Sequence, residues 1–179
     1  MRHSVAMARP RIISDDRIHD AVLRLISERG EKAAALSAVA RATGLAAPTL
    51  VQRFDSREGM VRAALSAMFD RLEARLQAAE ATAPLSAKGA QALLKTLAED
   101  EEAIAPAQLL PVVMRDPALR VRAAAWRAAV EQALALRLGG GDRGREAAAL
   151  LFAAWQGQRL WQGAGDKGFR LKDAVKAVR

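Results

Sequence analysis

The sequence predicts an all-α protein of about nine helices, and three observations lead to this fold class. The 179 residues are rich in Ala, Leu, Arg, Glu and Gln, which are strong helix formers. Runs of alternating Val, Ile and Thr, which would indicate half-buried strands, are absent. Apolar residues recur instead at spacings of three and four, the period of one face of an α-helix.

Composition narrows the class of protein further. The chain has no Cys, so it offers neither a disulfide framework nor a thiolate metal site. No apolar run reaches the roughly 18 residues that a membrane-spanning helix needs, and residues 1–10 lack the apolar centre of a signal peptide. We therefore expect a cytoplasmic protein that has no membrane partner.

The stretch from Arg17 to Met60 carries the most information. Its first part has an apolar stripe at helical spacing, which predicts a helix that Ser14 caps and Gly30 ends. The stripe consists of Ile18, Ala21, Val22, Leu25 and Ile26. Two short helices are then predicted, over residues 37–43 and 47–53. Gly44 lies between them and can adopt the positive φ of a tight turn.

Helix, tight turn and helix is the arrangement that places a second helix in the major groove of DNA. The outward positions of that second helix are Thr49, Val51, Gln52 and Arg53. Gln can bond the edge of adenine and Arg the edge of guanine, each through two hydrogen bonds. Arg57 and the amides at the start of the next helix suit phosphate. The alternative is a small helical bundle with a glycine turn and no role on DNA.

This stretch also resembles, without a gap, the N-terminal DNA-binding domain of the tetracycline-repressor-like (TetR-type) family of bacterial transcriptional regulators. The matching segments are Ile18, Ala21, Leu25 and Gly30, then Val39–Ala40, Ala42–Leu45, Thr49–Leu50 and Phe54–Met60. The resemblance implies a helix-turn-helix head that contacts a double-stranded DNA operator. With the outward positions above, the DNA-binding residues expected are Ser37, Ala46, Ala47, Pro48, Thr49, Val51, Gln52, Arg53 and Arg57.

Four positions depart from the family pattern, in three ways. Val51 stands where the family usually has Tyr, and Arg57 stands where it usually has Lys. Ala35 and Ala46 stand where Thr or Ser usually caps the second and third helices, and each lost cap costs about 1 kcal/mol unless Ser37 replaces the first.

We expect four segments along the chain. Residues 1–13 form a flexible basic arm, residues 14–55 the helix-turn-helix domain, residues 56–80 a connecting helix, and residues 81–179 a helical domain for ligand binding and dimerisation. The arm carries Arg2, Arg9 and Arg11 and no acid, so it can reach into a minor groove or be a tail with incidental charge.

Caps and prolines divide the C-terminal domain into further helices. Ser86 can cap a fifth helix, Pro106 and Pro111 bracket a short sixth, and Asp116–Pro117 starts a seventh that runs to about residue 138. After three glycines, Asp142 is expected to cap an eighth helix over residues 143–162, and a ninth follows over 169–178. The acidic run of residues 99–102 is read as a solvated helix end, so we expect no metal site.

The eighth helix is apolar on more than one face, whereas a helix on the wall of a single domain needs one apolar stripe. One face is therefore expected to meet a partner, and the resemblance implies a homodimer through the last two helices of each protomer. A fully buried core helix is the alternative. The candidate interface residues are Leu151, Ala154, Trp155, Gln158, Trp161, Leu171 and Val175.

The resemblance also implies an effector pocket in the C-terminal domain, although residues of these types in such positions are more often plain core than ligand contacts. The candidates are Met68, Leu72, Leu97, Gln108, Met114, Trp126 and Trp155. Few polar residues lie among them, so we expect a small apolar effector.

Catalysis finds little support, because the chain has two histidines, His3 in the arm and His19 on the expected outer side of the first helix. No nucleophile–base pair can be assembled from them and no cofactor is expected. The net charge of +8 favours polyanionic partners, although thirteen of the basic residues lie in residues 115–179, outside the head. The sequence therefore predicts a sequence-specific DNA-binding regulator, acting as a ligand-responsive repressor. The alternative is a basic helical interaction module without sequence-specific DNA binding.

Overall fold

The computed structural model describes residues 13–98, 106–161, 164–165 and 168–178. In these residues nine α-helices, one 3₁₀ turn and no strand are found, which confirms the all-α prediction. The N-terminal elements are α1 (Asp15–Arg29), η1 (Glu31–Ala33), α2 (Leu36–Thr43), α3 (Ala47–Phe54) and α4 (Arg57–Thr82). The C-terminal elements are α5 (Ala87–Ala98), α6 (Pro106–Val113), α7 (Pro117–Arg137), α8 (Gly141–Trp161) and α9 (Leu171–Ala177).

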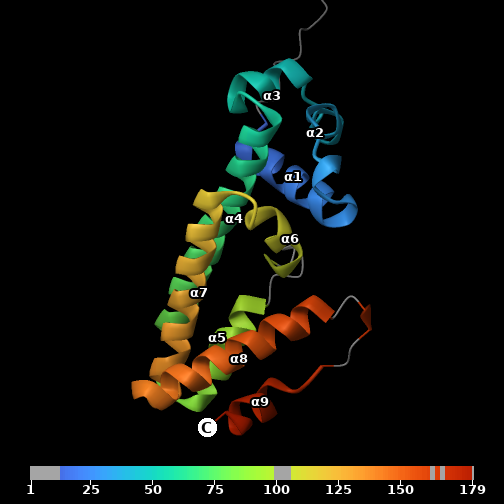
Figure 1. Cartoon of the computed structure of the whole chain (residues 1–179). Helices are drawn as coiled ribbons and strands as arrows, with labels where there is room; N and C mark the ends of the chain where they lie inside the picture. The colour runs from blue at the N-terminus through green and yellow to red at the C-terminus, as the bar shows by residue number, and fades with distance from the viewer. Residues whose placement is uncertain (1–12, 99–105, 162–163, 166–167, 179) are drawn as a thin grey trace, which may run out of the picture.

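The helices form a head and a bundle that share one long helix. Helices α1 to α3 make the head, and α4 runs from it into the bundle, where α7 lies along it (Figure 1). Helix α8 packs on α7, and α9 packs on α5 and α8 at the end far from the head. Because α4 also packs on α1 and α3, it belongs to both parts.

The core is continuous along α4. The stripe expected to point inward from this helix is buried, and it consists of Val61, Leu65, Met68, Leu72 and Leu76. Those side chains belong to the same buried cluster as Ile18 and Leu50 of the head and Leu134 and Leu151 of the bundle. A surface helix needs only one buried face, whereas α4 buries more than one. The head and the bundle therefore share a single core.

Helix ends follow the expected caps in three places. The Ser56 hydroxyl accepts a hydrogen bond from the Gly59 amide at 2.9 Å, and the Ser86 hydroxyl accepts one from Gly89 at 3.2 Å. A carboxylate oxygen of Asp116 accepts from the amides of Ala118 and Leu119 at the start of α7. These side chains satisfy amides that the helix leaves without partners.

At other ends the expected caps do not form. Ser14 occupies the position before α1 and makes no capping hydrogen bond. The starts of α2 and α3 are likewise uncapped, as expected from Ala35 and Ala46, and Ser37 does not replace the missing cap of α2. The head therefore depends on packing more than on local hydrogen bonds at its helix ends.

Two local predictions in the bundle were wrong. Helix α8 begins at Gly141, so Asp142 lies in its first turn and not before it. Pro111 lies inside α6 and does not end it. The helix continues because Leu109 and Val113, four residues apart, are both fully buried, and their burial offsets the backbone hydrogen bond that proline removes. The acidic run of residues 99–102 lies outside the described residues.

Arginines from α7 hold that helix against α4. Arg122 contacts the carboxylates of Asp70 at 2.5 Å and Glu73 at 3.0 Å, and it donates to the Ser66 carbonyl at 2.9 Å. Arg137 is 5% exposed and donates to the carbonyls of Glu80 and Ala83, beside the C-terminal end of α4. A cation there complements the negative end of the helix dipole.

We predict that Gly59→Ala destabilises the protein by about 1–3 kcal/mol, the usual cost of overpacking. A Cβ on Gly59 would overlap the backbone carbonyl of Phe54, so the junction between α3 and α4 would have to shift. Chemical denaturation measures the effect. Gln77→Ala, at an exposed side chain farther along α4, serves as control and is expected to change stability by less than about 0.5 kcal/mol. Equal stability of the two variants would contradict the junction geometry.

Candidate nucleic-acid interface

The turn between α2 and α3 orients the second of these helices. Gly44 adopts a left-handed conformation with φ 75°, and the amide of Leu45 donates to the Ala40 carbonyl at 3.1 Å. Val39 and Leu50 anchor the two helices, because both are fully buried. A side chain at Gly44 would meet no neighbouring atom, so the demand for glycine comes from the backbone angle.

The opposite face of α3 points away from the core. Val51 is 42% exposed, and Pro48, Gln52 and Arg53 are also exposed, while Thr49 is half-buried. In the part of the chain that the structure describes, no hydrogen-bond partner is found for the side-chain amide of Gln52. Among the remaining candidates, Ser37 and Ala46 are exposed and Ala47 is half-buried. The outward face is thus largely uncharged apart from Arg53.

Arg53 is engaged within the head. Its guanidinium donates to the carbonyl of Ile13 at 2.7 Å and to the carboxylate of Asp15 at 3.0 Å. These two acceptors lie at the start of α1, so the side chain joins the end of α3 to the point where the described chain begins. The residues of the basic arm, 1–12, lie outside the described part of the chain.

Arg57 is also engaged, at the start of α4. It donates to the Glu31 carbonyl at 2.5 Å and to the Glu58 carboxylate at 3.2 Å. The Glu31 carboxylate in turn receives a hydrogen bond at 2.5 Å from Arg115, in the segment between α6 and α7. A set of charges therefore connects a residue expected at DNA phosphate with the C-terminal bundle.

The sequence predicted that His19 lies on the outer side of α1, and this prediction was wrong. Its ring packs against Phe54 with centroids 5.8 Å apart, and both ring nitrogens are buried without a hydrogen-bond partner. Helical periodicity predicts an outward position for His19, because the pattern along α1 does not show that α3 covers this side. Burial is the main cause that lowers the pKa of His19, while Asp15, Asp16 and Asp20 oppose the shift and Arg71 adds to it.

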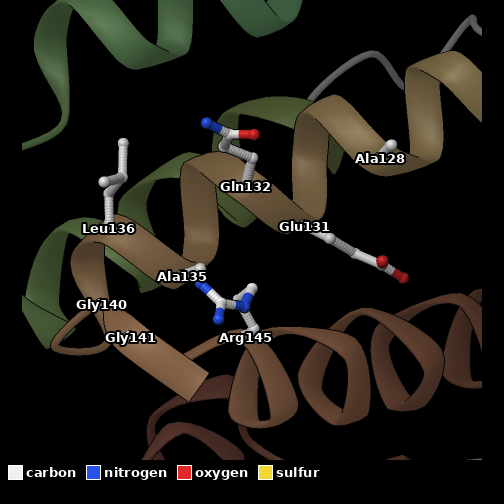
Figure 2. A pocket seen from close by; sticks show the side chains of 8 residues that line it. All are labelled: Ala128, Glu131, Gln132, Ala135, Leu136, Gly140, Gly141 and Arg145. Atoms are coloured by element: carbon white, nitrogen blue, oxygen red, sulfur yellow. The ribbon is translucent and has the colours of Figure 1, made fainter. Parts of the chain in front are cut away.

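The candidate pocket residues do not share one environment. Met68, Leu72, Leu97, Trp126 and Trp155 are buried in the core. Met114 is 40% exposed, and the side chain of Gln108 lies outside what the structure describes. Figure 2 shows a pocket of about 310 Å³ where α7 ends and α8 begins. None of the seven candidates lines this pocket, whose walls include Glu131, Gln132, Leu136 and Arg145.

The candidate interface residues divide into two groups. Leu151, Trp155 and Val175 are buried inside the protomer, at 0%, 6% and 1% exposure, so they are not available to a partner. Ala154 and Trp161 are exposed, while Gln158 and Leu171 are half-buried. The sequence predicted two apolar faces on α8, but it did not show which residues lie inside the protomer and which lie on its surface.

Exposed apolar side chains also lie on α7. The interface predicted from the sequence did not include this helix. Val121 is 72% exposed and Leu136 56% exposed. They lie on the side of the helix away from the buried residues Leu119, Trp126 and Val130. The sequence could have indicated this second apolar side of α7, because Ala125 and Ala128 lie on it between Val121 and Leu136.

The comparisons with known proteins agree with this geometry. Residues 18–64, which hold the three helices of the head and the start of α4, match the family described as bacterial regulatory proteins, tetR family. Residues 18–64 thus resemble the DNA-binding head of TetR-family regulators. The match confirms the family that the sequence resembled and extends the matched segment of α4 from Met60 to residue 64.

Individual TetR-related proteins resemble the chain over different lengths. The HTH-type transcriptional repressor ComR of Escherichia coli (strain K12) is 36% identical over 70 residues, which are 39% of this chain and 33% of that protein. The chain thus matches about a third of the length of this curated relative.

Solved structures resemble the fold of the chain over most of its length. A transcriptional regulator from Rhodococcus sp. Rha1 has a TM-score of 0.75 and 23% identity, covering 93% of this chain and 94% of that one. A member of TetR family from Streptomyces coelicolor A3 has a TM-score of 0.67 and 23% identity, covering 90% and 94%. At these identities the likeness establishes the fold.

Metal sites and membrane-spanning helices are two other features considered for the described residues. Among its described residues, no three acidic, His or Cys side chains are placed to hold a metal ion. Within the same residues, no helix is long and apolar enough to cross a membrane.

We predict that acid destabilises the protein partly through His19. Because burial lowers the pKa of His19 in the folded state, the unfolded chain binds its proton more tightly. The stability from neutral His19 is present above about pH 6.5, the usual value for histidine, and is lost as the pH falls. Melting temperatures of the wild type and His19→Leu between pH 8 and pH 5 check this. The difference should move in favour of the variant toward low pH, and parallel curves would contradict it.

Proposed function

We propose that this TetR-family regulator binds operator DNA sequence-specifically as a homodimer and represses transcription until a small effector binds. The outward face of α3 is the observation that carries the proposal, since a helix anchored at Leu50 presents Gln52 and Val51 to solvent. The similar ComR protein of Escherichia coli is a transcriptional repressor, which supports repression here. Binding to the chromosome would place the protein in the cytoplasm.

Base reading is assigned chiefly to Gln52 with help from Thr49 and Val51. The Gln amide can bond adenine through two hydrogen bonds, and the Val and Thr methyl groups can contact the methyl of thymine. Arg53 was expected to read guanine, but its guanidinium already donates to two acceptors at the start of α1. Its role in the proposal is to hold α3 against α1.

Phosphate contact is assigned to the start of α4. Ser56 takes up the amide of Gly59, and the amide of Glu58 bonds to its own carboxylate. The amide of Arg57 is left to face an anion at the positive end of the helix. The Arg57 side chain lies at the same place. Such contacts would fix the register of the protein on DNA and carry no sequence information.

Substitutions in the head should separate these two roles. Gln52→Ala is expected to cost about 1–3 kcal/mol on the operator, because a base contact is lost, and to leave binding to random DNA unchanged. Arg57→Gln is expected to weaken binding to both DNAs and to lower the salt slope by about 0.9, the value for one phosphate.

Mobility-shift titrations at several salt concentrations, with DNA flanking the gene and random DNA, make this comparison. Lys88→Gln, an exposed change in α5, is the control. A specific reader should prefer the operator by at least about 10³-fold. Equal binding of both DNAs by the wild type would favour the basic interaction module instead.

Homodimerisation is assigned to α7 and α8. Besides Val121 and Leu136 on α7, three large apolar side chains on α8 are more than half exposed: Leu150, Leu160 and Trp161. Exposed apolar side chains in such number indicate a surface that another protein covers. Helices α7 and α8 are neighbours joined by a short turn, so two copies can form a four-helix bundle.

This assignment changes the pair of helices expected from the sequence, which was α8 and α9. Helix α9 packs its buried Val175 in the protomer, next to α5 and α8. The pocket of Figure 2 opens beside Leu136 on α7, so it would accept a side chain of the second copy. Two heads at a fixed separation would then read two half-sites on one duplex.

We predict that Leu150→Arg converts a dimer into a monomer at micromolar concentration, because it would bury an unpaired charge between the copies. The side chain is 63% exposed in the protomer, so the fold should persist. The control is Leu85→Arg, since Leu85 is 74% exposed between α4 and α5. Sedimentation velocity measures both variants. A wild-type monomer, or a Leu150→Arg dimer, would refute the assignment.

The route from effector to DNA is assigned to the segment between α6 and α7. There Arg115 contacts Glu31 of the head, and Asp116 receives a hydrogen bond at 2.6 Å from Arg62 of α4. An effector that shifts this segment would move α4 and with it the separation of the two heads. Couplings of this kind are typically about 1–3 kcal/mol.

A further inference from the structure

Three aromatic rings form a row inside the bundle. Trp126 of α7 lies 5.9 Å from Phe152 of α8, and Phe152 lies 5.9 Å from Trp155, measured between ring centroids. All three side chains are nearly fully buried, at 5–6% exposure. The indole nitrogen of Trp126 has no hydrogen-bond partner and no contact with solvent. A buried donor without an acceptor is unusual, because its desolvation is not compensated.

A cation lies at the other end of this row. The guanidinium of Arg159, one turn after Trp155 in α8, lies 5.4 Å from the centroid of the Trp155 ring. The residue is half-buried, yet no carboxylate or carbonyl within the described residues accepts a hydrogen bond from it. Burial and the nearby positive charge of Arg75 in α4 both lower the pKa of Arg159.

Other arginines of the bundle show how this one differs. Arg122, Arg127 and Arg170 each contact a carboxylate at 3.0 Å or less. Arg159 lies over an aromatic ring, as Arg122 and Arg127 do, but no carboxylate partner is found for it among the described residues. Partial burial of a cation without a carboxylate partner is unfavourable, so an anion bound there would relieve it.

We propose that Arg159 binds the anionic head group of an amphipathic effector, whose apolar body packs on the aromatic row of Trp155, Phe152 and Trp126. The unpartnered indole N–H of Trp126 would donate to an acceptor farther along the same molecule. This inference rests on the proposed ligand control and refines it, because the sequence led us to expect an effector that is simply apolar. A guanidinium on an aromatic face selects for a carboxylate or phosphate through charge-assisted hydrogen bonds.

Matched acids and alcohols test the inference on the full-length protein without DNA. The probes are decanoate against 1-decanol and 2-naphthylacetate against 2-naphthaleneethanol. Tryptophan fluorescence and thermal shift measure their binding. The acid of each pair should bind at least about 10-fold more tightly than the alcohol, the effect expected of a hydrogen bond to a charged group.

Variants assign that preference to one side chain. Arg159→Gln should abolish the preference for acids and should not lower the melting temperature of the ligand-free protein, because it removes an unpaired half-buried charge. Arg159→Lys should retain part of the preference. Arg143→Gln, an exposed change at the opposite end of α8, is the control and should leave the preference intact.

Two results would overturn the inference: equal binding of acid and alcohol by the wild type, or an unchanged preference in Arg159→Gln. A fall of several degrees in the melting temperature of Arg159→Gln, without any acid preference in the wild type, would assign Arg159 a structural role only. Operator binding by ligand-free wild type is measured in parallel. If DNA binds and the acids do not, this inference alone fails. If the acids bind and DNA does not, the proposed function fails and the anion site stands.

Discussion

The burial of α4 along its whole length is the constraint on which the rest of the structure depends. Its first turns pack on α1 and α3, and its later turns pack on α5 and α7. Met60 and Leu65 are fully buried near the head, and Ala79 is buried at the far end. Because close-packed side chains cannot be displaced one at a time without opening cavities, a shift of α4 in the bundle has to be felt in the head.

Charged contacts fix the orientation of the elements that pack on α4. Arg122 ties α7 to the outer side of α4, and Arg137 closes the end of α4. The contacts of Glu31 and Arg62 with the segment before α7 lie near the head itself. Most of these ion pairs are partly exposed, so each contributes little to stability. Their value lies in fixing orientation, since a guanidinium with two or three acceptors permits few arrangements of its helices.

The bundle contains features that a core built for stability alone would lack. Trp126 leaves a buried donor without an acceptor, and Arg159 leaves a half-buried charge without an anion in the described part of the chain. Large apolar side chains of α7 and α8 remain in water. Each feature costs free energy in an isolated, ligand-free protomer. Together they favour a protein whose bundle is completed by other molecules, one of them a second copy.

The sequence by itself determined the helical class, the head and most helix ends, because these depend on neighbours along the chain. The spacing from Ile18 to Ile26, the glycine at position 44 and the caps at Ser56 and Asp116 act through local geometry. Only the tertiary structure decided which faces are covered. It buried His19 under α3, bound Arg53 to the start of α1, hid Leu151 and Val175, and exposed Val121 and Leu136. Helical periodicity shows that a side has apolar residues, but which partner meets that side depends on contacts between residues far apart in the sequence.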